Sequence, residues 1–228
     1  MKFVLIMNKN SYAGREYLNA ISKSNIMLDV ITVGSFAEID HDEDLRCAGL
    51  WQPPKEVSFR DRFDFYHFQS LTDKRLLLFL KKQNYDIGLQ GGTGILKSGL
   101  IDEFAHGILN FHPGNLPQYR GCSCPEWQLF EGKDIYCTCH FIDTGIDTGD
   151  ICFKTKLCVN YQSYAHFRAS IYPRISEFVV ITLEKIVKLR NIPRFPQNED
   201  EAIYRQYIGS QKIEEISSLL SSKKIHIH

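Results

Sequence analysis

The sequence predicts an α/β fold: a Rossmann-like, mostly parallel twisted sheet with helices on both faces. Apolar strand-like runs alternate with amphipathic helical segments along the first half of the chain, as in folds built from strand-helix-strand units. These runs are continuously apolar, which is typical of strands buried on both faces. Polar side chains stand at the end of one run, and ligand sites in such folds lie at the carboxyl ends of strands. We therefore expect the functional site at that edge of the sheet.

The chain begins with a strand-helix-strand unit. Residues 2–7 and 27–33 have the composition of two buried parallel strands. A helix is expected between them over residues 12–22, where apolar side chains recur at helical spacing, namely Tyr17, Leu18 and Ile21. This unit predicts the parallel pairing with which the sheet starts.

A second unit predicts the strand that carries the polar pair. It consists of an amphipathic helix over residues 71–82, a strand over 87–89, the segment 100–104 and a strand over 107–111. The helix presents Leu76, Leu77 and Leu80 on one face. The alternation favours a sheet covered on both faces.

Residues 34–70 are less regular. They contain an acidic patch over 38–44, then Trp51, and an aromatic-rich segment over 63–68. We expect a surface excursion whose aromatic side chains pack back on the core. A lip over a substrate pocket is the alternative, because long loops in compact domains are often functional.

The second half predicts antiparallel additions and a long helix. Strands are expected over residues 136–142 and 151–159, the latter of antiparallel type, and a helix over 164–190 that is interrupted or kinked at Pro173. Pro193 and Pro196 then close a main domain over residues 1–192. A short C-terminal extension, 193–228, carries two short helical patterns, over 199–207 and 212–220.

Composition restricts the class of partner. The 228 residues include 27 basic and 27 acidic side chains, so the formal net charge is zero. This balance lacks the electrostatic footprint of a nucleic-acid or membrane-surface protein. No apolar stretch approaches the ~20 residues that span a bilayer, and the first residues show no signal-peptide pattern. We expect a cytoplasmic protein without nucleic-acid or membrane partners, and the seven sparse cysteines suit a reducing compartment.

The cysteines do not predict a metal site. Cys122 with Cys124, and Cys137 with Cys139, are separated by one residue, whereas structural zinc pairs usually have two to four intervening residues. The second pair alternates within a predicted strand, where thiols pack as small apolar groups. We expect no metal.

Three polar residues point to acyl chemistry. Asn110 and His112 are two positions apart at a strand end, so their side chains point the same way, and Asp147 lies in a turn between Gly145 and Gly149. An amide can stabilise an oxyanion, and an imidazole beside a carboxylate can carry a proton, which suits acyl transfer to an amine. Taken singly, each residue also fits a structural role as a turn cap, a buried donor or an Asx-turn residue.

These residues lie in motifs that resemble the folate-dependent formyltransferase family: Asn-x-His-Pro at the strand end, Leu-Pro-x-Tyr-Arg-Gly in the loop, and Asp-x-Gly in the turn. The resemblance covers roughly residues 75–190 and is specific in its middle third. It implies a formyltransferase fold, a catalytic domain over 1–192, and catalytic roles for Asn110, His112 and Asp147. Asp143 and Asp150 are alternative carboxylates, but the Asp-x-Gly spacing begins at Asp147.

The resemblance also implies 10-formyltetrahydrofolate as cosubstrate. Gly94, Ile95 and Leu96 are similar to the apolar loop that holds the pterin ring in the family, and we expect Thr93 and Asp143 to belong to the same cofactor-binding set.

The expected acceptor amine depends on where this sequence differs from two groups of formyltransferases. Glycinamide ribonucleotide formyltransferases carry a Gly-Ser-Gly phosphate loop after the first strand, whereas residues 8–15 here read NKNSYAGR. Methionyl-tRNA formyltransferases add a basic RNA-binding domain of ~100 residues, which the neutral charge and short tail do not match. The chain is most similar to sugar N-formyltransferases, also in the stretch Cys124-Pro125-Glu126-Trp127.

The expected function is therefore transfer of a formyl group from 10-formyltetrahydrofolate to a nucleotide-linked aminodeoxysugar for surface polysaccharide (lipopolysaccharide) synthesis. We expect four substrate-binding residues, Lys9, Tyr119, Arg120 and Trp127. The alternatives are another small amine such as glycinamide ribonucleotide, hydrolysis of the formylfolate, and an inactive binding module. A homodimer is left open.

Overall fold

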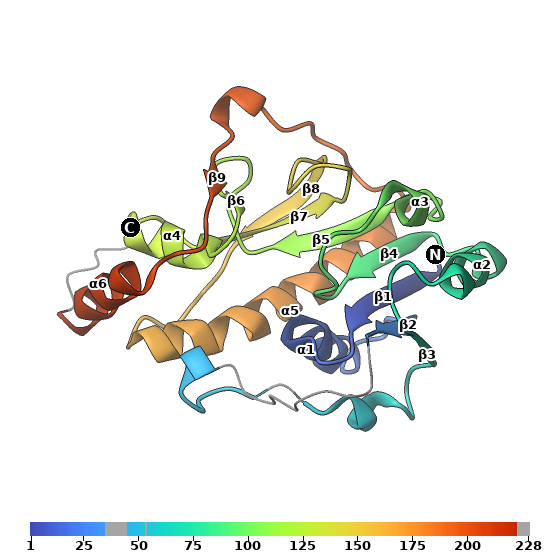
Figure 1. The fold of residues 1–228 in the computed structure, drawn as a ribbon, viewed down its shortest axis with the longest axis horizontal. Coiled ribbons are helices and arrows are strands. Elements are labelled where there is room, and N and C mark those ends of the chain that lie inside the picture. The colour runs from blue at the N-terminus through green and yellow to red at the C-terminus, as the bar shows by residue number, and fades with distance from the viewer. Residues whose placement is uncertain (35–44, 53, 223–228) are drawn as a thin grey trace.

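The computed structural model describes residues 1–34, 45–52 and 54–222. Its centre is a seven-stranded sheet with the strand order β3-β2-β1-β4-β5-β7-β8 (Figure 1). The strands β3, β2, β1, β4 and β5 run parallel to one another. At the β5 edge, β7 and then β8 are added in antiparallel pairing. Their bounds are β1 Phe3–Asn8, β2 Leu28–Val33, β3 Phe65–Phe68, β4 Ile87–Gln90, β5 Ile108–His112, β7 Tyr136–Phe141 and β8 Ile151–Lys156. The predicted α/β fold is confirmed.

The central strand β1 shows why the apolar runs are continuous. Phe3, Leu5 and Met7 belong to one buried cluster together with α1 (Tyr12–Ile21) and α5 (Tyr164–Leu189). Val4 and Ile6 belong to a second cluster with α2 (Lys74–Gln83) and α3 (Ser98–Ile101), because successive strand side chains point to opposite faces. The sheet therefore has a core on each face.

The helix α5 is not interrupted at Pro173, which corrects one of the two outcomes expected there, an interruption or a kink. It is one helix of 26 residues with Pro173 inside it. Its buried side chains form a continuous apolar stripe that includes Phe167, Ile171, Ile175 and Val179. We attribute the continuity to this burial, which outweighs the one backbone hydrogen bond that proline removes.

Residues 34–70 contribute an element that the sequence did not predict. The aromatic-rich segment forms β3, a short parallel edge strand in which Phe65 pairs with Val30. Trp51 packs on α1 and α5, stacked on Tyr172 with ring centroids 4.7 Å apart. These aromatic side chains do pack back on the core, as expected. The acidic patch over 38–44 lies outside the described residues.

The C-terminal extension differs from the predicted pair of helices. In the described part of the extension, residues 193–222, the one α-helix is α6 (Ser210–Ser221). Residues 199–207 form a 3-10 turn, η3 (Glu199–Glu201), followed by β9 (Tyr204–Arg205). β9 pairs in parallel with β6 (Arg120–Gly121), just before α4 (Cys124–Phe130). A long-range pairing has overridden the local helical pattern. Within the described part of the chain, no helix combines the length and apolar character needed to cross a bilayer.

Candidate active site

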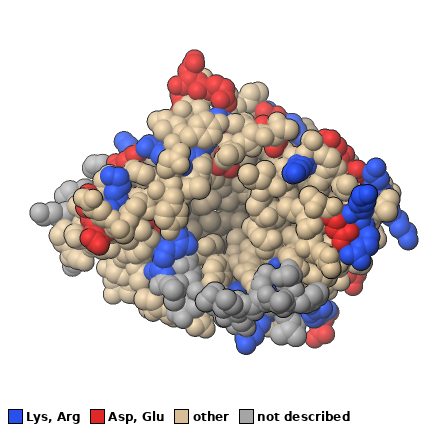
Figure 2. All heavy atoms as spheres, in the orientation of Figure 1, with Lys and Arg blue, Asp and Glu red and all other residues tan. Residues whose placement is uncertain are grey.

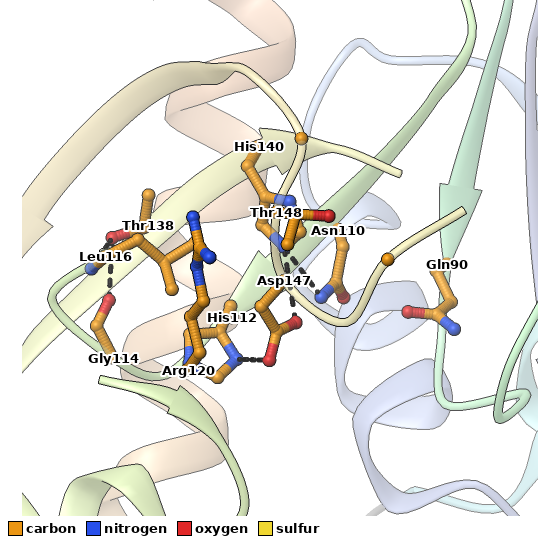
Figure 3. A network of polar contacts seen from close by, with 12 residues as sticks. Gln90, Asn110, His112, Gly114, Leu116, Arg120, Thr138, His140, Asp147 and Thr148 are labelled. Atoms are coloured by element: carbon orange, nitrogen blue, oxygen red, sulfur yellow. Dashed lines mark hydrogen bonds and ion pairs between the residues drawn. The ribbon is translucent and has the colours of Figure 1, made fainter. Parts of the chain in front are cut away.

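The candidate site lies where β5 ends beside β7 (Figures 1 and 3). In this antiparallel pair Asn110 is opposite His140, and His112 is opposite Thr138. Residues directly opposite each other share one face of the sheet, so the four polar side chains gather there. The pairing of β7 with β8 has an irregularity between Cys139 and His140. Such bulges re-aim side chains near functional sites.

Asp147 reaches this face from the turn after β7. Its backbone is left-handed, with φ of 56°, a conformation that Asp tolerates better than most residues. The turn is tight against the end of β7: a Cβ on Gly149 would lie 2.0 Å from the carbonyl oxygen of Phe141. Any side chain at position 149 would therefore displace the turn. The Oδ2 atom of Asp147 accepts a hydrogen bond of 2.9 Å from the Gly121 N–H.

The Asp147 carboxylate lies between two imidazoles (Figure 3). Oδ2 is 3.5 Å from Nδ1 of His112, and Oδ1 is 3.6 Å from Nε2 of His140. The same His140 nitrogen is 3.1 Å from Nδ2 of Asn110. Burial acts to raise the pKa of Asp147, but the two imidazoles and the Gly121 N–H outweigh it and lower the pKa to about 2. The carboxylate is therefore ionised throughout the neutral range.

His112 lies behind Asp147, buried and with both ring nitrogens in contact with protein groups. Its Nε2 is 2.6 Å from the carbonyl oxygen of Tyr119. A Cβ on Gly114 would lie 2.5 Å from the same nitrogen, so the loop closes tightly over the ring. Burial lowers the pKa of His112, although the Asp147 charge acts to raise it. Because a carbonyl oxygen can only accept, the contact to Tyr119 is made by an Nε2–H that donates.

A cavity of about 560 Å³ opens beside these groups. Asn110, His140 and Asp147 line it, whereas His112 does not. Four of the residues predicted to bind the cofactor also line it, namely Gly94, Ile95, Leu96 and Asp143. The Ile95 side chain is 79% exposed, which leaves an apolar surface at the cavity mouth.

Thr93 lies apart from this cavity. It is buried and lines a neighbouring cavity of about 550 Å³, which Ile95 also lines. Gln90 ties the two together, because its Nε2 donates to the Gly94 carbonyl oxygen at 2.5 Å and lies 3.3 Å from the Thr93 hydroxyl. Asp143 supports the turn on the other side, where its Oδ1 accepts from the Gly145 N–H and the Thr148 hydroxyl.

The structure does not bring the four predicted substrate-binding residues together in this cavity. Lys9 follows β1, and its backbone N–H donates to Val33. Tyr119 donates its hydroxyl to Glu131 at 2.6 Å, and Trp127 donates its indole N–H to the Gln206 carbonyl at 2.8 Å.

The predicted substrate-binding role of Arg120 needs correction. Its side chain is fully buried beneath the C-terminal extension. Every guanidinium nitrogen donates to a protein group: to Gln197, Glu199 and Tyr204. The guanidinium is thus held by the protein itself.

Two residues of this region were not predicted as functional. They are His140, which contacts Asn110 and Asp147, and Gln197, which contacts the Asp147 turn. Among the described residues, no group of three or more His, Cys, Asp or Glu side chains is arranged to hold a metal ion. All seven cysteines are free thiols.

The comparison with known families agrees with the motifs. A family model described as formyl transferase matches residues 1–175. The chain belongs to the formyl transferase family. The methionyl-tRNA formyltransferase of Clostridium tetani is 29% identical over 177 residues, which is 76% of this chain and 56% of that protein. The chain thus spans just over half the length of this relative and of its Clostridioides difficile counterpart.

Solved structures share the fold at low sequence identity. A sugar N-formyltransferase from Shewanella matches with a TM-score of 0.62 at 16% identity, covering 97% of this chain and 88% of that one. An N-formyltransferase from Helicobacter canadensis matches with a TM-score of 0.58 at 18% identity, covering 93% and 72%. The formyltransferase fold predicted from the motifs is confirmed.

The lowered pKa of His112 predicts a pH-dependent stability. The unfolded chain takes up this proton near the ordinary value of 6.5, and the folded protein only at lower pH. The unfolded state therefore binds more protons between these values, so stability rises with pH across that window, by at most about 1.4 kcal/mol per pH unit. Urea unfolding of wild type and His112→Gln should show a difference in unfolding free energy that increases with pH below the ordinary value of 6.5 and levels above it. A difference that decreases with rising pH would instead indicate a charged His112 stabilised by Asp147.

Proposed function

We propose that this protein transfers the formyl group of 10-formyltetrahydrofolate to the amino group of a nucleotide-linked aminodeoxysugar. The observation that carries the proposal is the common cavity: an amide donor, Asn110, and an ionised carboxylate, Asp147, line the same cavity as the apolar loop at Ile95. Family membership independently supports formyl transfer.

The cavity fits a folate by its chemistry. Ile95, Leu96 and Ile142 offer apolar surface for a flat ring system, and Gln90 and Asp143 offer polar groups at its edges. A volume of about 560 Å³ is in the range of small-molecule sites. The bound folate supplies the formyl carbon, with its N10 nitrogen as the leaving group.

Asn110, Asp147 and His112 each have a separate role in the proposed transfer. A bond forms between the acceptor nitrogen and the formyl carbon, the bond from that carbon to N10 breaks, and one proton passes from the acceptor amine to N10. Asn110 has one N–H directed at His140 and a second for the formyl oxygen, where negative charge develops. Asp147 attracts the amine proton but, with a pKa of about 2, does not retain it, so the proton passes on to N10. His112 supports Asp147 from behind.

The acceptor assignment depends on the loop after β1 and on the surface charge. In place of a glycine-rich phosphate loop, Ser11 caps α1 by accepting from the Gly14 N–H at 3.1 Å. On the described atoms of the face in Figure 2, charged side chains of both signs are scattered around a central hollow without a continuous basic band. Both features favour a small acceptor. The Helicobacter canadensis protein, which shares the fold, was solved with folinic acid and dTDP-3-aminofucose.

Methionyl-tRNA is the second candidate acceptor. It is favoured by the curated sequence relatives, which are methionyl-tRNA formyltransferases. Their match is confined to just over half of their own length.

An acceptor panel tests the proposal. Purified protein with 10-formyltetrahydrofolate should formylate at least one dTDP-, UDP- or GDP-linked 3-amino or 4-amino sugar, detected as a mass increase of one formyl group. Methionyl-tRNA, glycinamide ribonucleotide and water serve as competing acceptors in parallel reactions. Efficient formylation of methionyl-tRNA or glycinamide ribonucleotide, with none of any aminosugar nucleotide, would contradict the acceptor assignment. Release of formate alone would indicate a hydrolase.

Asn110→Ala tests the assignment of the oxyanion donor. Loss of such a donor lowers kcat by about 100-fold or more, because the contact strengthens only as charge develops on the oxygen. The matched control is Asn191→Ala, which truncates an exposed amide beyond α5 and should leave kcat unchanged. A folded Asn110→Ala protein with wild-type kcat would rule out this role for the amide.

A further inference from the structure

The C-terminal extension contacts the catalytic turn directly through Gln197. Its Nε2 donates to two backbone carbonyl oxygens of that turn, those of Asp147 at 2.9 Å and Gly149 at 2.8 Å. Its Oε1 accepts two hydrogen bonds from Arg120, from Nε at 3.1 Å and Nη2 at 2.9 Å. Both ends of the amide are therefore used, and the side chain has one orientation that satisfies all four contacts.

Arg120 fixes the acceptor end of that amide. The guanidinium forms a paired contact with Glu199, at 2.6 and 2.8 Å, and Nη1 also donates to the Tyr204 hydroxyl at 3.2 Å. Paired arginine–carboxylate contacts constrain geometry as well as adding energy. Because Arg120 begins β6 and its neighbour Gly121 donates to the Asp147 carboxylate, the same strand holds the turn from two sides.

The extension has a fixed register on the sheet. Phe195 exchanges two backbone hydrogen bonds of 2.9 Å with Ile151 at the start of β8. This pairing fixes the backbone two residues before Gln197. The Gln197 side chain therefore extends to the Asp147 turn from a backbone segment that is itself hydrogen-bonded to β8.

We infer that Gln197, clamped by Arg120, is a positioning residue that holds the backbone of the Asp147 turn and thereby aims the catalytic carboxylate. The inference rests on the proposed function. Asp147 has a left-handed backbone, which a non-glycine residue keeps only where its surroundings enforce it. The two hydrogen bonds to the carbonyl oxygens of residues 147 and 149 enforce it here. A small shift of a catalytic group costs up to about 100-fold in rate.

We call the contacts of Gln197 with Arg120 and with the Asp147 turn the clamp. Gln197→Glu tests it with almost no change in side-chain volume. The variant keeps an acceptor for Arg120 but replaces the donor to the turn with a second oxygen, which repels the two carbonyls. We expect kcat for formyl transfer to fall by about 10- to 100-fold with KM for the folate within about twofold of wild type. Gln206→Glu makes the same chemical change at an exposed position of the same extension and should change neither constant.

Hydrogen exchange tests the clamp without depending on activity. The Gly121 amide donates to the Asp147 carboxylate, and the Cys122 amide donates to the Arg205 carbonyl in the neighbouring β6–β9 pair. In Gln197→Glu, exchange at Gly121 should become at least about tenfold faster while exchange at Cys122 stays as in wild type. This combination distinguishes a moved carboxylate from general opening of the extension.

The outcomes separate the two claims. Wild-type exchange at Gly121 in the variant, or equal acceleration at Gly121 and Cys122, would overturn the clamp. Faster exchange at Gly121 with unchanged kcat would overturn its role in aiming the carboxylate. Absence of formyl transfer by the wild-type protein, with the selective exchange effect present, would refute the proposed function while supporting the clamp.

Discussion

The site depends on one carboxylate that is largely buried yet kept ionised. Burial alone would favour the protonated acid, and Asp147 overcomes this because the Gly121 N–H and two imidazoles surround its oxygens. Each of those partners comes from a different element: His112 from β5, His140 from β7 and Gly121 from β6. The sheet, the loop before α4 and the turn after β7 together supply the contacts that keep this buried carboxylate ionised.

The C-terminal extension contacts the turn that carries this carboxylate. Although residues 193–228 follow the region that carries the motifs, Gln197 and Glu199 connect the Asp147 turn to Arg120. Arg120, which family resemblance suggests as a substrate contact, is instead the buried centre of that connection. The boundary expected at residue 192 thus falls within a continuous network of contacts.

The sequence allowed prediction of what depends on local pattern. Continuous apolar runs identified the parallel strands, and the spacing of Asn110 and the Asp-x-Gly turn identified two residues that now line one cavity. His140 was not predicted as a site residue, because it reaches the site through the antiparallel register of β5 and β7, which no local sequence pattern encodes. The role of Gln197 and the strand β9 were not predicted for a similar reason, because their partners lie far earlier in the chain. Taken alone, residues 199–207 have the pattern of a helix.

The charge state of Asp147 is the most direct test of this account. We would follow the carboxyl ¹³C chemical shift of Asp147 by NMR as the pH is lowered, with Asp147→Asn to assign the signal. We expect the shift to stay at its ionised value at least down to about pH 3, because the pKa is lowered from 3.8 to about 2. A titration midpoint at or above 3.8 in the folded protein would show that the two imidazoles and the Gly121 N–H do not stabilise the charge, and the central claim would be wrong.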